Sequence, residues 1–237
     1  MAKPAGVRRT YDQECGLAHG LDVVGERWTL LIIRELLHGP CRYHELLEAL
    51  PGIGTNLLAD RLAHLTEAGL IEPTEPGRRT AGYALTDLGR MLREPVVGLA
   101  RFGLRVAAGQ PRTEGAVTRA QWAALAIEAM VDQERVPPVD EVYQFDVDGE
   151  RFHVEVAAGR AAVRLGDAPE PVATIMTEAD TFFELGMRRL DPIEAVISGA
   201  VRVSGTPAAV PRCLWLIGLG SDPAAAPRFG RGAVAAR

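Results

Sequence analysis

The residue types best suited to contact another molecule lie at the start of one short helical pattern. Thr55 and Asn56 begin the stretch 55–68, and Ala59 and Asp60 follow one turn later on the same face. An asparagine side chain can pair bidentately with adenine, and a threonine can reach a phosphate or a thymine methyl group. The pattern therefore predicts recognition chemistry directed at the major groove of duplex DNA.

Arginines lie before and after this stretch. Arg42 and Arg61 are candidate phosphate contacts, which position a protein on DNA without specifying its sequence. Arg78 and Arg79 fall in the turn between two predicted strands, within reach of the DNA backbone or an adjacent minor groove. Arg27 is interpreted either as a phosphate contact or as half of an ion pair.

Two short helices and a β wing must hold these side chains against the DNA. Residues 43–50 and 55–68 read as helices separated by Pro51 and Gly52, and the second buries Leu58, Leu62 and Leu65 on one face. Residues 70–74 and 82–85 read as two strands joined by the arginine-bearing turn. This order predicts a winged helix-turn-helix.

Further helices are predicted on both sides of this core. Residues 12–20 should form a short helix. A second helix should begin at Asp22 or Gly25 and bury a stripe made of Trp28, Leu31, Ile32, Leu36 and Leu37. After the wing, Thr86 should cap a long helix that runs to Ala108 and is interrupted at Pro95.

The pattern changes at the polar segment GQPRTEG, residues 109–115. We therefore predict a domain over 1–108, a linker over 109–117, a second domain over 118–220 and a flexible tail over 221–237. In the second domain Asp148 and Gly149 form a hairpin turn between strands 141–147 and 152–156. The remaining predicted elements are a helix at 118–131, strands at 161–165, 172–176 and 201–204, and helices at 179–190, 193–198 and 207–218.

Charge is distributed unevenly along the chain. The net charge is −5, but residues 1–112 carry a net +1 and residues 113–237 a net −6. Only charge close to the phosphates matters for docking, so the acidic second half does not exclude DNA binding. Lys3 is the only lysine beside 25 arginines, which indicates a GC-rich bacterial coding bias.

The first half resembles the HxlR family of bacterial winged-helix regulators over about residues 11–108. The residues that carry the resemblance are Cys15, DVVGERWTLLIIREL at 22–36, Gly39-Pro40, LPGI at 50–53, and the stretch from Leu62 that ends in EAGLI at 67–71. The resemblance implies a DNA-binding transcription regulator that acts as a homodimer. It also implies that an N-terminal helix and the long helix 86–108 lie in the dimer interface.

Two positions depart from the family pattern. Gly54-Thr55-Asn56 replaces a common Ser-Pro-Lys-like entry to the recognition helix, and Asp60 stands where the family often has Gln or Arg. A carboxylate at the groove weakens general attraction to phosphates. The operator sequence therefore cannot be inherited from relatives.

Cys15 lies at the position of the family's N-terminal cysteine, which senses oxidants in some members. A redox role needs a thiolate in an electropositive setting, whereas Asp12 and Glu14 should raise the pKa of Cys15. We therefore expect a buried structural thiol. A redox-sensing regulator that uses Cys15, with a purely structural second domain, is the alternative function.

The second half resembles the sterol-carrier-protein-type lipid-binding fold. The residues that carry the resemblance are ATIMTEADTFFEL at 173–185, LDPIEAVISGAVRVSG at 190–205, and an apolar helix through Leu214 and Trp215. The resemblance implies a five-stranded sheet and helices that enclose an apolar tunnel. The candidate ligand-binding residues are Phe182, Phe183, Met187, Ile193, Val196, Ile197, Leu214 and Trp215, and Ile217 could line the same pocket. The alternatives are that these side chains only fill a core or that the domain adds dimer interface.

The overall expectation is an α+β protein, with a mostly helical winged helix-turn-helix followed by a sandwich-like lipid-carrier-type domain. No phosphate loop, nucleophile elbow or metal-ligand spacing is found, so we expect no enzymatic activity, cofactor or metal. The three cysteines and the lack of a long apolar run favour a cytoplasmic protein that is not bound to a membrane. The expected partners are double-stranded DNA, a second copy of the chain and an apolar small molecule.

Overall fold

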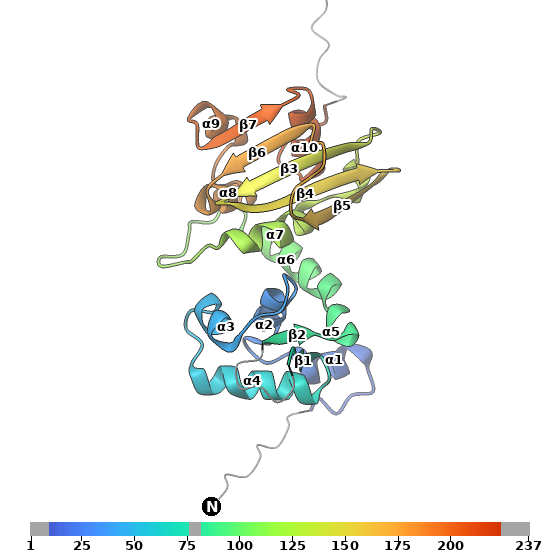
Figure 1. Ribbon diagram of the computed structural model, residues 1–237, viewed down its shortest axis with the longest axis vertical. Coiled ribbons are helices and arrows are strands. Elements are labelled where there is room, and N and C mark those ends of the chain that lie inside the picture. The colour runs from blue at the N-terminus through green and yellow to red at the C-terminus, as the bar shows by residue number, and fades with distance from the viewer. Residues whose placement is uncertain (1–9, 76–81, 224–237) are drawn as a thin grey trace, which may run out of the picture. The chain divides into compact units, whose positions relative to one another are not determined.

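The computed structural model describes residues 10–75 and 82–223 and divides the chain into two units, Met1–Val96 and Val97–Arg237 (Figure 1). In the described ranges, no helix is long and apolar enough to cross a membrane. The structure confirms the α+β class, because a mostly helical unit with a two-stranded wing is followed by a unit with a five-stranded sheet.

The first unit consists of short helices and the wing. Its elements are α1 (Gly16–Val24), α2 (Thr29–Leu36), α3 (Tyr43–Ala49), α4 (Thr55–Glu67), β1 (Ile71–Pro73), β2 (Tyr83–Leu85), α5 (Asp87–Arg90) and the start of α6 (Arg93–Ala107). β1 pairs antiparallel with β2, and Cys41 forms an isolated bridge to Tyr83, so β2 is bonded on both edges. The predicted winged helix-turn-helix order is confirmed.

Two of the predicted helices begin at the wrong residue. Asp12 and Trp28 both have a positive φ, which breaks the backbone before each helix, so α1 begins at Gly16 and α2 at Thr29. Trp28 therefore precedes α2 and is only half-buried. Leu31 is exposed, while Ile33 is fully buried in its place.

The predicted long helix is broken earlier than expected. Thr86 does cap a helix, since its hydroxyl accepts a hydrogen bond from the Gly89 N–H, but α5 ends at Arg90. α6 then starts afresh at Arg93, and Pro95 lies in its first turn. A proline there removes an N–H that has no partner within the helix, so it does not interrupt α6.

The second unit is built on a five-stranded sheet with the order β5-β4-β3-β6-β7, in which only β3 and β6 run parallel. The strands are β3 (Glu141–Val147), β4 (Glu150–Ala157), β5 (Arg160–Leu165), β6 (Ala173–Thr177) and β7 (Val201–Gly205). The helices are the remainder of α6, the 3-10 turns η1 (Ala120–Trp122) and η2 (Gln133–Arg135), α7 (Ala123–Met130), α8 (Ala179–Gly186), α9 (Pro192–Ile197) and α10 (Ala209–Leu216). Asp148 and Gly149, both with positive φ, make the predicted hairpin turn.

One face of this sheet carries the core of the second unit. Alternate residues of β3 and β4, such as Phe145 and Phe152, are buried against α7, α8 and α10. The rings of Phe145 and Phe152 stack at 5.2 Å, and Phe182 of α8 meets Phe152 edge to face. The five-stranded sheet expected from the family resemblance is confirmed.

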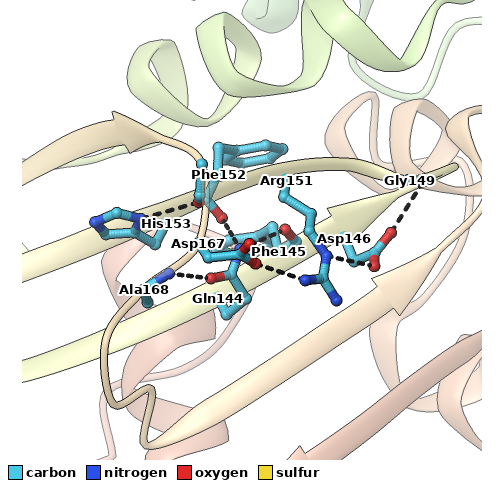
Figure 2. Close-up of polar contacts among 10 residues, drawn as sticks. Gln144, Phe145, Asp146, Gly149, Arg151, Phe152, His153, Asp167 and Ala168 are labelled. Atoms are coloured by element: carbon cyan, nitrogen blue, oxygen red, sulfur yellow. Dashed lines mark hydrogen bonds and ion pairs between the residues drawn. The ribbon is translucent and has the colours of Figure 1, made fainter.

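The opposite face of the sheet holds a buried polar network around Gln144 (Figure 2). The Gln144 amide donates to the carbonyls of Phe145 and Phe152 at 2.9 and 2.8 Å, and its oxygen accepts from the Ala168 N–H at 2.6 Å. Beside it, Arg151 bridges Asp146 and Asp167. These contacts hold the segment that follows β5 against the sheet.

We predict that Gln144→Leu lowers the free energy of opening of β3 and β4 by about 2 kcal/mol, because it leaves buried backbone groups without partners. Hydrogen exchange followed by mass spectrometry measures this local opening. Ser204→Ala is the matched control, since Ser204 is exposed in the same cross-strand row, and it should change the value by less than about 0.5 kcal/mol. Equal exchange in both variants would contradict the role assigned to Gln144.

Candidate nucleic-acid interface and apolar cavity

α4 has a fully buried face and an exposed face. Leu58, Leu62 and Leu65 are at most 1% exposed, as the sequence predicted. The exposed face at the N-terminal end of the helix consists of Thr55, Asn56, Ala59 and Asp60. The structure brings these four side chains together on one surface. Their contact with DNA stays a prediction.

The start of α4 is tied to the preceding helix. The Tyr43 hydroxyl of α3 donates a hydrogen bond to the Thr55 carbonyl at 2.7 Å. Gly54 precedes the helix and has no side chain to cap it, so the first N–H groups of α4 have no side-chain acceptor from that position. Such N–H groups suit a phosphate oxygen.

The candidate arginines differ in their surroundings. Arg61 forms an ion pair with Glu26 at 2.8 Å and donates to the Arg27 carbonyl at 3.4 Å, and its side chain is only 19% exposed. The Arg27 guanidinium lies 5.4 Å from the ring centroid of Trp28. Arg42 is exposed just before α3, and its backbone N–H donates to the Glu45 carboxylate. Arg27 and Arg42 are both exposed and accessible to a phosphate, whereas Arg61 is held by Glu26.

The two wing arginines, Arg78 and Arg79, lie outside the described residues. The strands on either side of them are in place, with Ile71 opposite Leu85 and Pro73 opposite Tyr83. Contact between the wing arginines and DNA therefore stays a prediction.

Cys15 is exposed, and the expectation of a buried thiol with a raised pKa is wrong. The backbone N–H groups of Ala18 and Leu17, at the start of α1, lower the pKa of Cys15. These N–H groups act on the Cys15 sulfur directly. The Glu14 carboxylate instead faces His19, with 3.7 Å between Glu14 Oε2 and His19 Nε2. The carboxylates of Asp12 and Glu14 therefore do not decide the pKa of Cys15, because Cys15 immediately precedes α1 and meets its first N–H groups.

The other two cysteines are in apolar surroundings. Burial, with smaller contributions from Glu35 and Glu45, raises the pKa of Cys41 to about 11. Burial likewise raises the pKa of Cys213 to about 12. Among the three thiols, Cys15 therefore carries the largest thiolate fraction at neutral pH.

An apolar cavity lies within the second unit, between the core face of the sheet and its helices. The volume of this cavity is about 70 Å³. Phe182, Val196, Leu214 and Ile217, which the sequence predicted for the pocket, line it. Phe183, Met187 and Trp215 do not line it, and Ile193 and Ile197 are largely exposed on α9.

Sequence reasoning missed most of the residues that line the cavity. The additional residues that line it are Ile127, Met130, Phe145, Ile175, Thr177, Leu185, Gly186, Pro192, Val201, Val203, Val210, Cys213 and Leu219. The alternation of residues along the strands would indicate part of this lining, since Val201 and Val203 of β7 both face the cavity with Arg202 between them. The predicted set came only from the helices.

Comparisons with known proteins match two parts of the chain to two different families. Residues 23–110 match the HxlR-like helix-turn-helix family, and residues 123–210 match the SCP-2 sterol transfer family. An uncharacterized HTH-type transcriptional regulator of Synechocystis sp. is 34% identical over 38% of this chain and 67% of its own length. A second one, of Mycobacterium bovis, is 39% identical over 42% of this chain.

The chain spans only part of these relatives, namely 61% of the Mycobacterium protein. Among solved structures, quinone-bound YodB from Bacillus subtilis is 28% identical, with a TM-score of 0.35 over 38% of this chain and 98% of that chain. The two curated relatives match 93 and 103 residues of this chain.

We predict that Arg42→Ala and Arg61→Ala affect binding to a random-sequence duplex differently. Arg42→Ala should reduce the slope of log affinity against log salt by about 1, because an exposed phosphate contact is lost. Arg61→Ala should leave that slope unchanged and lower stability by about 0.5 kcal/mol, because its ion pair with Glu26 is partly solvated. Fluorescence anisotropy titrations at several salt concentrations measure both slopes. The same loss of slope in both variants would contradict the assignment of Arg61.

Proposed function

We propose, from the premise that the chain belongs to the HxlR-like helix-turn-helix family and is a transcriptional regulator, that it binds a two-fold operator as a homodimer and responds to an apolar ligand. The observation that carries the proposal is the exposed face of α4, beside a helix start without a side-chain cap. In this proposal residues 1–108 bind DNA, 109–117 are the linker and 118–220 bind the ligand. The protein acts in the cytoplasm, where the operator is accessible.

α4 is the recognition helix in this proposal. Asn56 pairs with a base edge, and Thr55 and Ala59 contact a phosphate or a thymine methyl group. Asp60 on the same face disfavours phosphates and favours a cytosine amino group, so it acts on specificity. Arg42 and the wing arginines Arg78 and Arg79 position the helix, and Arg61 supports α4 from the protein side.

Exposed apolar side chains on two helices support a homodimer. Leu99, Phe102 and Val106 are more than half exposed along one stripe of α6. On α1, Leu17 and Leu21 are exposed one turn apart. A second copy of the chain would remove these surfaces from water. Two-fold symmetry then requires half-sites about 10 bp apart, centre to centre, or a multiple of that spacing.

The cavity of the second unit supports ligand control. Its lining is almost entirely apolar, and four of the predicted residues belong to it, namely Phe182, Val196, Leu214 and Ile217. A ligand changes operator affinity only if it binds the DNA-competent and DNA-incompetent states unequally. α6 begins in the first unit and continues into the second. In this proposal a difference in ligand affinity between the two states therefore acts on DNA binding through α6.

We predict that Asn56→Ala weakens binding to the protein's own operator about tenfold, because one bidentate base contact is lost. The operator is first located by footprinting of the upstream region, and affinity is then measured by gel shift. Thr66→Ala is the matched control: Thr66 is exposed at the far end of α4, and its hydroxyl already bonds the Leu62 carbonyl. Unchanged specific binding by Asn56→Ala, or a monomer that does not bind the duplex, would overturn the proposal.

The surroundings of Cys15 favour a second candidate function, a thiol-based switch. Its exposure and lowered pKa make it the reactive thiol of the chain. In this reading oxidation of Cys15 changes operator affinity, and the second domain is only structural.

We predict that iodoacetamide at neutral pH alkylates Cys15 well before Cys41 and Cys213. A lowered pKa leaves more thiolate at that pH, while the raised pKa values of the other two keep them protonated. Mass spectrometry of the peptides gives the order of reaction.

Diamide treatment of wild type and Cys15→Ser before the gel shift then separates the two functions, because an identical response in both excludes the switch.

A further inference from the structure

The segment from the end of α1 to the residue before α2, residues 23–28, has an uncommon backbone conformation. We refer to these residues as the α1–α2 turn. It ends at Trp28, whose φ of +79° belongs to the region that favours glycine. The N–H of Thr29 donates to the Glu26 carbonyl at 3.2 Å across the turn. A residue as large as tryptophan keeps such a conformation only where its surroundings require it.

The ring of Trp28 lies beside the turn that joins α3 to α4. A β-carbon built on Gly52, in that turn, would lie 3.7 Å from Trp28 Cη2 and 3.9 Å from Trp28 Cζ2. On the solvent side the Arg27 guanidinium lies 5.4 Å from the ring centroid, and Trp28 as a whole is half-buried. The left-handed backbone at Trp28 therefore directs its ring onto the connection between the two helices of the helix-turn-helix.

Two side chains of α4 bind the same α1–α2 turn from the other direction. His64 Nε2 lies 3.1 Å from the Val23 carbonyl oxygen and donates to it, because a carbonyl oxygen can only accept. Arg61, one turn earlier on α4, donates to the Glu26 carboxylate at 2.8 Å and to the Arg27 carbonyl at 3.4 Å. The recognition helix is thus fastened to both ends of the turn.

The α1–α2 turn also continues α1, the helix on which Leu17 and Leu21 are exposed. In the homodimer proposed above, these side chains face the second copy of the chain. The turn therefore connects the proposed dimer contact directly to the recognition helix. Two-fold symmetry repeats this geometry in the partner, so the distance between the two α4 helices depends on how firmly each is held to its own α1.

The geometry of duplex DNA makes that distance measurable. One base pair inserted between two half-sites moves them apart by about 3.4 Å and rotates one relative to the other by about 35°. A dimer whose recognition helices are rigidly placed cannot follow both changes and loses base contacts in one half-site. A dimer whose recognition helices are loosely held can follow them.

We propose that the α1–α2 turn sets the spacing between the two recognition helices, and that Trp28 and His64 are its positioning residues. They determine which half-site spacing the protein accepts, although they act on DNA only through α4. This inference rests on the proposed homodimer and goes beyond it, because it assigns a part of operator specificity to residues outside the DNA-facing surface.

The test measures the affinity of the full-length protein for three versions of its operator, after the operator has been located by footprinting. One version has the natural half-site spacing, one has a base pair removed between the half-sites, and one has a base pair added. Wild type should lose at least about tenfold in affinity for either altered spacing, because base contacts in one half-site are disturbed. A random-sequence duplex measures binding that does not depend on spacing, and native mass spectrometry gives the oligomeric state.

Trp28→Gly removes the ring and leaves a residue that adopts the positive φ without strain. This variant should bind the natural operator about tenfold more weakly and lose less than about threefold more on either altered spacing. Its affinity for the random duplex should equal that of wild type, because the exposed cations stay in place. Trp28→Phe keeps an aromatic ring and should restore most of the preference for the natural spacing.

His64→Ala tests the same inference from α4, since it removes the hydrogen bond to the Val23 carbonyl. It should reduce the preference for the natural spacing to about threefold. Thr66→Ala is the matched control two positions later on α4: Thr66 is exposed, and its hydroxyl bonds the Leu62 carbonyl of the same helix. This control should keep the spacing preference of wild type.

The outcomes separate this inference from the proposed function. A folded, dimeric Trp28→Gly protein with the spacing preference of wild type overturns the inference, and if that variant does not fold, His64→Ala is judged by the same criterion. A wild-type dimer that binds all three spacings equally also overturns it and leaves the homodimer in place. A wild-type monomer, or a protein that binds an isolated half-site as tightly as the whole operator, overturns the proposed homodimer itself.

Discussion

The burial of three leucines on α4 is the constraint on which the DNA-facing surface depends. Fully burying one leucine contributes about 1.5–3 kcal/mol, so three such side chains contribute as much as the net stability of a small domain. A rotation of α4 about its axis would expose Leu58, Leu62 and Leu65 to water. The helix is therefore fixed in rotation, and Thr55, Asn56, Ala59 and Asp60 face outward because the leucines face inward.

Burial of apolar residues also fixes the direction of side chains in the second unit, where strand residues alternate between the two faces of the sheet. Along β7, Val201 and Val203 face the cavity, and Arg202 between them is exposed. Alternation of this kind decides which strand residues reach the ligand space, and α7, α8 and α10 close the space from the other side. Phe145 and Phe182 line this space, and both rings contact Phe152 in the core behind it.

Features set by local interactions could be predicted from the sequence, and features set by distant contacts could not. The leucine spacing of α4 and the Asp148–Gly149 turn are local, and the structure confirms both. The left-handed backbone at Trp28 and the break before α6 depend on tertiary packing, for which the sequence holds no periodic signal. Among the site residues, Arg61 could not be assigned, because its partner Glu26 is 35 positions away along the chain.

Net charge and local charge differ in the second unit. Residues 113–237 carry a net charge of −6. One cleft of the second unit is nevertheless lined by four arginines, two from that range and two from α6. Repulsion between separated charges is screened beyond about 10 Å at moderate salt, whereas a guanidinium in contact with a carboxylate is not. Local chemistry therefore determines whether an anion binds. A tenfold change in operator affinity corresponds to about 1.4 kcal/mol, which one charge-assisted hydrogen bond to α6 can supply if it forms in only one of the two states.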